Sequence, residues 1–306
     1  MPLYQNTSGA LRSIKEQPFK LEKEIQKLVE DNLMELMNLE RVKSEFSVKN
    51  RRIDTLAFDP QTSGFVIIEY KRDRNLSVVD QGFAYLSIML ENKAEFIIEY
   101  NESLKKNLKR NQVDWSQSRV AFVAPSFTEN QKQAANFKDI AIELWEVRRY
   151  ENQIISINPI RKTSRESIQQ VATKESKIKQ VTEEIKVFEE EDHLQRCSEA
   201  IRELYEELKS RILGLDGLEV SPTKTYIGFK YNNRVITDME FLSNHIKQRL
   251  NLKTGQLDDP KGLFRDMTGI GHWGVGDYEA KFNAEVDIDY LMSLVNQSYQ
   301  YHLHHE

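Results

Sequence analysis

The chain has 306 residues, of which 39% are hydrophobic, and a formal net charge of -5. This length suits two ordinary domains with separate cores, and the charge excludes a protein that binds polyanions through an overall basic surface. A single cysteine, Cys197, excludes a disulfide framework and suits a reducing compartment. Neither an apolar signal core nor a run of about 20 apolar residues occurs, so we expect a soluble, cytoplasmic protein without a membrane segment.

The first half of the chain alternates between the two kinds of regular structure. Hydrophobic periodicity and turn residues predict, in chain order, a helix over 19–36, strands over 44–48, 52–58 and 65–71, a helix over 77–93 capped by Ser77, a short strand over 94–99, a basic helix over 102–110, a strand over 119–124, a helix over 128–137, and strands over 140–147 and 153–157. This order predicts an α/β fold with a mixed sheet flanked by helices.

The composition changes after residue 160. The segment 161–185 is charged and poor in apolar residues, which is typical of a solvated helical linker between two domains. The remainder, 186–306, reads as a second, smaller α+β domain. Its predicted elements are a helix over 194–213, a hairpin of 225–231 with 234–236, a helix over 238–250, a strand over 278–282 and a helix over 288–301. We therefore expect domains at 1–160 and 186–306.

One strand ends in an unusual way. The apolar run before position 69 belongs in a core, yet Glu69, Tyr70 and Lys71 follow it without a turn. Side chains alternate along a strand, so Glu69 and Lys71 share a face. Asp54 lies in the neighbouring strand, about 4.8 Å away, and could lie beside Glu69. Two such carboxylates repel unless a cation lies between them, and oxygen ligands of this kind suit Mg²⁺ or Mn²⁺.

This arrangement of Asp54 and Glu69-x-Lys71 resembles the PD-(D/E)XK nuclease superfamily. The proline of that motif is absent, because Ile53 precedes Asp54. Two further segments strengthen the resemblance. The next helix carries Gln81 and Tyr85, similar to the Gln-x-x-x-Tyr element of the RecB-like branch, and 21–26 resembles the glutamate-bearing first helix of NucS-like (EndoMS-like) endonucleases.

The resemblance implies a restriction-endonuclease-like fold and a Mg²⁺-dependent hydrolase of DNA, with Mn²⁺ as an alternative ion and DNA preferred over RNA. It implies that Asp54, Glu69 and the backbone carbonyl of Tyr70 hold the metal, and that Lys71 orients the attacking water. A glutamate of the first helix would complete the catalytic set. Both Glu22 and Glu24 are available, and Glu22 is preferred because it lies nearer the apolar stripe of that helix.

Nucleic-acid contacts are expected around the same site. The resemblance implies that Gln81 and Tyr85, one helical turn apart, hold the strand or the water. Basic residues close in sequence, namely Arg52, Arg72 and Arg74, are candidates for phosphate contacts.

Simpler interpretations stay open. Glu69 and Lys71 could be a plain ion pair, and Asp54 a charge that protects a sheet edge. The domain could then be a non-catalytic module that binds nucleic acid.

The second domain, with its segments 225–230 and 271–279, resembles a small bacterial domain of unknown function whose members are sometimes labelled predicted transport proteins. It could instead make the chain an adaptor in a defence system, through a protein partner or a homodimer.

Overall fold

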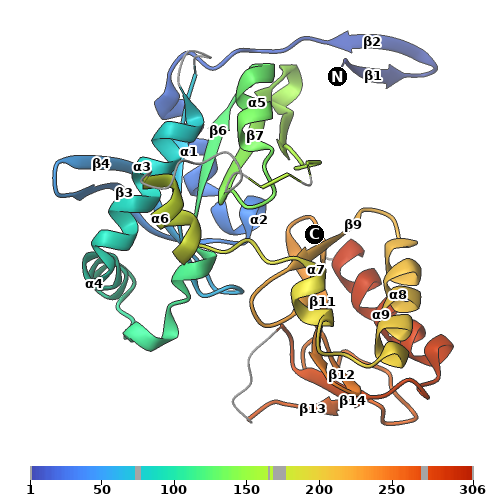
Figure 1. The fold of residues 1–306 in the computed structure, drawn as a ribbon. Coiled ribbons are helices and arrows are strands. Elements are labelled where there is room, and N and C mark those ends of the chain that lie inside the picture. Colours follow the sequence, from blue (N-terminus) through green and yellow to red (C-terminus); the bar gives the residue numbers. More distant parts are fainter. Residues whose placement is uncertain (1, 73–76, 165, 168–176, 270–274, 305–306) are drawn as a thin grey trace. The chain divides into compact units, whose positions relative to one another are not determined.

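The computed structural model describes residues 2–72, 77–164, 166–167, 177–269 and 275–304. The chain divides into two compact units, Met1–Val187 and Phe188–Glu306 (Figure 1). Each unit has its own sheet and its own apolar core. The mixed α/β character expected from the sequence is thereby confirmed.

The first unit is built on a mixed sheet with the strand order β3-β4-β5-β6-β7-β8. Its strands are β3 (Glu40–Val48), β4 (Arg51–Asp59), β5 (Gly64–Tyr70), β6 (Arg119–Ala124), β7 (Ile142–Arg149) and β8 (Ile155–Pro159). The first three form an antiparallel meander, β5, β6 and β7 run parallel, and β8 pairs antiparallel with β7. The parallel pairs require crossovers, which the intervening helices provide.

Helices cover both faces of this sheet. They are α1 (Glu22–Asp31), α2 (Leu33–Met37), α3 (Val78–Glu91), α4 (Lys93–Leu104), α5 (Glu129–Ala135) and α6 (Lys177–Glu184), with short 3₁₀ turns at Arg110–Gln112, Trp115–Gln117 and Glu151–Gln153. In β5, Phe65 and Ile67 pack in the core on the side of α3, whereas Val66 and Ile68 pack on the side of α1. A strand buried on both faces has no polar side, which explains the continuous apolar run in the sequence.

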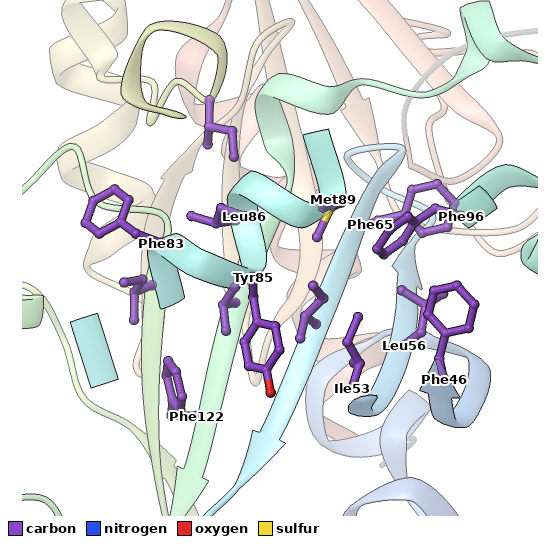
Figure 2. Packing of buried hydrophobic residues seen from close by; sticks show 14 of the residues in the cluster. Phe46, Ile53, Leu56, Phe65, Phe83, Tyr85, Leu86, Met89, Phe96 and Phe122 are labelled. Carbon is purple, nitrogen blue, oxygen red and sulfur yellow. The ribbon is translucent and has the colours of Figure 1, made fainter. Parts of the chain in front are cut away.

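Helix α3 lies close to the sheet. Ser77 caps its first turn by accepting a hydrogen bond from the Asp80 amide, as expected. A Cβ atom on Gly82 would lie 2.4 Å from the Ile142 Cδ1 atom, so the helix approaches β7 through its glycine. Figure 2 shows the apolar side of α3, including Tyr85, over the strands. The ring of Tyr85 is buried among these residues while its hydroxyl belongs to the polar site described below.

Most strands of this unit were predicted to within a few residues, and two elements were wrong. The expected strand at 94–99 is part of α4, because Phe96, Ile97 and Tyr100 form one helical face against the core. The expected basic helix at 102–110 ends at Leu104, since Lys105 adopts the left-handed conformation that terminates a helix. A hairpin of β1 (Leu3–Thr7) with β2 (Ala10–Ile14) was not anticipated.

Part of the expected linker belongs to the first core. Val181 and Ile185 are buried and pack in the cluster that also contains the apolar side of α3.

Across the described parts of the chain, none of the helices has the length and apolar character needed to cross a membrane.

The described residues of the second unit form a sheet with the strand order β13-β14-β12-β11-β10-β9. Its elements are α7 (Glu190–Leu194), α8 (Glu199–Leu213), β9 (Leu218–Pro222), β10 (Ile227–Tyr231), β11 (Arg234–Leu242), β12 (His245–Leu250), β13 (Arg265–Asp266), β14 (Tyr278–Phe282) and α9 (Ile288–His304). The hairpin of β10 and β11 is confirmed. The helix expected at 238–250 is wrong, because this segment forms the end of β11, a tight turn and β12. Cross-strand contacts hold it, with Arg249 opposite Asp238.

Candidate active site

The site begins where β5 ends. Lys71 Nζ lies 2.7 Å from Glu69 Oε1, and the side chains are 13% and 6% exposed. Both therefore project from one face of the sheet, as the alternation predicted. The intervening Tyr70 projects to the opposite face, where its hydroxyl lies 3.1 Å from Thr55 Oγ1. The Lys71 amide donates to the carbonyl oxygen of Val123, so β5 stays paired with β6 beyond its last pair with β4, Thr55 with Ile68.

Helix α3 brings two polar side chains to the same carboxylate. Gln81 Nε2 donates to Glu69 Oε1 at 3.0 Å and lies 3.3 Å from the Tyr85 hydroxyl. Burial, followed by the negative charge of Glu69, raises the pKa of Tyr85, so its hydroxyl stays protonated. Gln81 and Tyr85 thus lie where the sequence placed them, one turn apart and beside Glu69.

Asp54 sits at an interruption of the sheet. Its neighbour Thr55 pairs with Ile68 in β5, but neither the β3–β4 nor the β4–β5 register includes Asp54 itself. Its Oδ2 atom accepts the amide of Tyr70 at 3.1 Å, and its carbonyl oxygen accepts a hydrogen bond from Gln26 of α1. One step beyond the last β4–β5 pair, Asp54 faces Glu69, as expected.

The two carboxylates form an acidic pair. Burial, followed by the charge of Glu69, raises the pKa of Asp54 to about 6. The second oxygen of Glu69, Oε2, is buried and accepts no hydrogen bond within the described structure. A buried carboxylate oxygen without a donor is costly, and a divalent cation would remove both that cost and the repulsion. The donor set therefore fits Mg²⁺ or Mn²⁺.

The protein ligands for such an ion are few. Among the described residues, no group of three or more His, Cys, Asp or Glu side chains is placed to hold a metal. Two carboxylates suit Mg²⁺, which commonly keeps several water ligands and takes others from substrate phosphates. They do not suit a closed structural site, which takes four protein ligands.

The first helix reaches the site through one of its two candidate glutamates. Glu22 Oε1 accepts the amide of Arg72, the residue after Lys71, at 2.9 Å. Glu24 instead pairs with Arg149 at 3.1 Å, away from this strand end. The Arg72 side chain also donates to the carbonyl oxygen of Lys20, so this arginine ties the end of β5 to the start of α1.

Two site residues were missed by sequence reasoning. Gln26 is buried in α1 and bonds the Asp54 carbonyl, and Glu45 of β3 faces Asp54 from the other side. The sequence signal for Gln26 is a polar residue next to Ile25, on the buried side of the helix. Glu45 gives no such signal. Its backbone is left-handed, with φ 56°, inside a strand, and a non-glycine residue rarely adopts that conformation, so the sequence does not indicate it.

The candidate phosphate contacts are less uniform. Arg52 is 67% exposed and pairs with Glu45, so it lies beside the site. Its carbonyl oxygen is also 3.5 Å from the Tyr85 hydroxyl. Arg72 is bonded to backbone as described above. Arg74 lies outside the described residues.

Comparison with known proteins gives three kinds of match. A protein-family model, Domain of unknown function (DUF5655), matches residues 190–302, which confirms the expected domain of unknown function in the second unit. Among solved structures, the chain is similar to an EndoMS–dsDNA2 complex, with 20% identity, 44% of this chain and 50% of that one covered, and a TM-score of 0.30. It is also similar to a repair endonuclease from Pyrococcus abyssi, with 20% identity, coverage of 40% and 45%, and a TM-score of 0.24.

Those structural matches span half or less of the endonuclease chains, and TM-scores of this size do not establish a common fold. A match along the whole chain is found in Haemophilus influenzae (strain ATCC 51907 / DSM 11121 / KW20 / Rd). That relative, described as an uncharacterized protein, is 50% identical over 300 residues, which cover 97% of this chain and 99% of the relative. At this identity and coverage, the chain belongs to the same protein family as the Haemophilus influenzae protein.

Proposed function

We propose that the first unit is a Mg²⁺-dependent nuclease of the PD-(D/E)XK type that hydrolyses phosphodiester bonds of DNA. One observation carries the proposal. Asp54, Glu69 and Lys71 converge from two adjacent strands, and the buried Glu69 Oε2 atom has no hydrogen-bond donor among the described residues. The mixed sheet with helices on both faces supports the proposal, because the motif resemblance implies a fold of this general class.

The acidic pair is assigned to the cation. Asp54 and Glu69, with the backbone carbonyl of Tyr70, would hold Mg²⁺ or Mn²⁺. A bound divalent ion supplies Lewis acidity toward the scissile phosphate. The raised pKa of Asp54 supports this assignment, because a pair of carboxylates that resists full ionisation gains most from a cation.

The lysine is assigned to the reacting atoms. Lys71 is only 13% exposed and is fixed by Glu69, so its ammonium group has a defined position rather than a solvated one. There it orients the attacking water and stabilises the negative charge that develops on the phosphate oxygens. A lysine suits this task because its ammonium group offers three rotatable donors.

The surrounding residues position this group. Gln81 orients Glu69 and donates a second hydrogen bond to the Tyr85 hydroxyl, which supports it. Tyr85 is assigned to holding the nucleic-acid strand. Glu22 fixes the backbone directly after Lys71. The preference for DNA over RNA comes from the motif resemblance.

Metal-dependent cleavage tests the proposal directly. Wild type, Lys71→Ala and a control, Lys43→Ala, are incubated with supercoiled plasmid and with single- and double-stranded oligonucleotides, in Mg²⁺, Mn²⁺ or EDTA. Lys43 is a suitable control because it is also an ion-paired lysine of this sheet, bonded to Glu99 on α4. We expect cleavage by wild type and Lys43→Ala, none in EDTA, and a loss of at least about 100-fold in Lys71→Ala.

Two results would contradict the enzyme assignment. If wild type and Lys71→Ala are equally inert on every substrate with either ion, the unit is not a nuclease. If both bind DNA equally and neither cleaves it, the non-catalytic alternative replaces the proposal.

A further inference from the structure

A three-residue ion cluster lies beside the acidic pair. Glu45 on β3 accepts hydrogen bonds from Lys23 on α1 and from the guanidinium of Arg52 on β4. The two cations come from different elements and meet at one carboxylate. Hydrogen bonding by Lys23, the largest cause, lowers the pKa of Glu45, although burial opposes it.

The cluster is built into the fold at a precise point. Ser44 pairs with Thr55 and Phe46 pairs with Ile53, so Glu45 faces Asp54 across the strand pair. Its left-handed backbone is a conformation that a non-glycine residue adopts only where the surroundings impose it. In this conformation the Glu45 carboxylate contacts both cations, Lys23 and Arg52, beside the candidate active site.

Gln26 connects this cluster to the active site. Its side-chain oxygen accepts a hydrogen bond from Lys23 at 3.0 Å, and its nitrogen donates to the Asp54 carbonyl at 3.0 Å. The position of Lys23 is therefore tied to the residue proposed to hold the metal.

The two cationic side chains are more exposed to solvent than the Glu45 carboxylate between them. The Lys23 and Arg52 side chains are 62% and 67% exposed, against 26% for Glu45. Ion pairs this exposed are weak, so another anion can replace the carboxylate. Two cations already held together also present a preorganised site, which lowers the cost of binding an oxyanion. The cluster of two cations and one carboxylate has a net charge of +1.

We propose that Lys23 and Arg52 form a phosphate-binding subsite and that Glu45 occupies it in the free protein. A phosphate of the substrate backbone displaces the Glu45 carboxylate and takes over both cations. This places a phosphodiester next to Asp54 and thus next to the acidic pair. The identity of the ligand as nucleic acid rests on the proposed function, whereas the oxyanion subsite rests on the cluster itself.

Glu45 is then an internal competitor of the substrate. Removing its charge frees both cations without removing either. Binding of a backbone phosphate should therefore strengthen when Glu45 is neutralised, and this gain should require both Lys23 and Arg52.

The test measures binding without cleavage. The full chain in EDTA is titrated with a fluorescein-labelled 12-base-pair DNA duplex, followed by anisotropy, and separately with inorganic pyrophosphate, followed by calorimetry. The variants are Glu45→Gln and Glu45→Asn, since asparagine tolerates a left-handed backbone. Glu99→Gln is the control, because it removes the same charge from another ion pair of β3. Circular dichroism confirms folding.

We expect Glu45→Gln and Glu45→Asn to lower the Kd for the duplex and for pyrophosphate about 2- to 5-fold, as for the loss of one exposed ion pair. Glu99→Gln should change neither Kd by as much. In Lys23→Ala/Arg52→Ala the duplex binds more weakly, and adding Glu45→Gln to this background gives no gain.

The outcomes separate the two proposals. If DNA binds but Glu45→Gln matches Glu99→Gln, or if its gain survives without the two cations, the subsite is wrong and the nuclease proposal stands. If DNA binds to no variant while Glu45→Gln still improves pyrophosphate binding, the oxyanion subsite stands without nucleic acid as its ligand in the metal-free protein, and the nuclease proposal is decided by the cleavage assay in Mg²⁺ or Mn²⁺. If neither probe binds any variant, the subsite is wrong, and the cleavage assay again decides the nuclease proposal.

Discussion

Gln81 and Glu69 are joined by a hydrogen bond of 3.0 Å between a helix and a strand end. The donor belongs to α3 and the acceptor to β5, so the carboxylate orientation depends on how the helix sits on the sheet. Glu69 Oε1 is shared by Gln81 and Lys71, which leaves Oε2 for a cation. The nuclease proposal therefore makes Gln81 a positioning residue.

The first prediction concerns this bond. Gln81→Ala should lower the rate of DNA cleavage about 10- to 100-fold, as is usual when a partner of a metal ligand is removed. The loss should appear in kcat and in metal affinity, because the carboxylate is free to rotate. Gln133→Ala, on the exposed side of α5, is the control. Equal activity of both variants would show that Gln81 does not position Glu69.

The second prediction concerns Asp54 in the metal-free protein. Its pKa is raised from 3.8 to about 6, so the folded state takes up the proton more readily than the unfolded state. The carboxylate of Asp54 therefore costs stability above pH 6, and this cost disappears as the pH falls toward 4.

Asp54→Asn should thus stabilise the first unit in EDTA at pH 8 by about 1 to 2 kcal/mol, after allowance for solvent screening, and have little effect near pH 4. Urea unfolding at several pH values measures it. Asp31→Asn, half-exposed at the end of α1, should change stability by under about 0.5 kcal/mol at either pH. A destabilised Asp54→Asn at pH 8 would contradict the raised pKa.

The third prediction concerns the contact of α3 with β7. A methyl group on Gly82 would overlap the buried side chain of Ile142. Gly82→Ala should therefore destabilise the first unit by about 1 to 3 kcal/mol, despite the better helix propensity of alanine, and should lower activity by moving Gln81. The double variant Gly82→Ala/Ile142→Ala, which lacks both the Cδ1 and the Cγ1 atoms that overlap, should lose less stability than the sum of the two single variants and recover part of the activity. Strictly additive losses of stability would mean that the overlap is not the cause.

The fourth prediction concerns the second unit. Arg249 is 7% exposed and contacts three carboxylates, those of Asp238, Glu240 and Glu279. Arg249→Met should destabilise this unit by about 3 to 5 kcal/mol, because Asp238 is then left buried without its counter-ion. Arg265→Met removes an exposed partner of Glu279 and should cost under about 0.5 kcal/mol. Thermal unfolding of the two variants distinguishes these values, and equal losses would contradict the role of burial.

Local sequence was sufficient where a segment carries its own pattern. The continuous apolar run of β5 implies burial on both faces, and Ser77 marks the start of α3, as the structure has it. The position of Asp54 beside Glu69 was predicted from side-chain alternation and from two strands that follow each other directly in the chain. Contacts between such neighbouring strands were therefore predictable.

Local sequence was insufficient where partners are distant. The run Phe96-Ile97-Ile98 fits either a strand or a helix, and only packing of Phe96 and Ile97 on the core selects the helix. Segment 238–250 spaces its apolar residues much as a helix does. In the structure it forms two strands that pair with each other and with β10 and β14, and periodicity does not report such partners. Glu45 was missed for the same reason, since its partners Lys23 and Arg52 lie in α1 and β4.

The backbone amide of Tyr70 donates its hydrogen bond to the Asp54 carboxylate rather than to a backbone carbonyl. The rate at which this single proton is replaced by solvent deuterium therefore reports the state of a side chain, which backbone amides in a regular ladder do not do. A bound ion that moves the Asp54 carboxylate, or protonation that weakens its acceptor oxygen, should speed the exchange of that amide proton. The exchange rate of the Tyr70 amide is therefore a spectroscopic probe of the site that needs no added label.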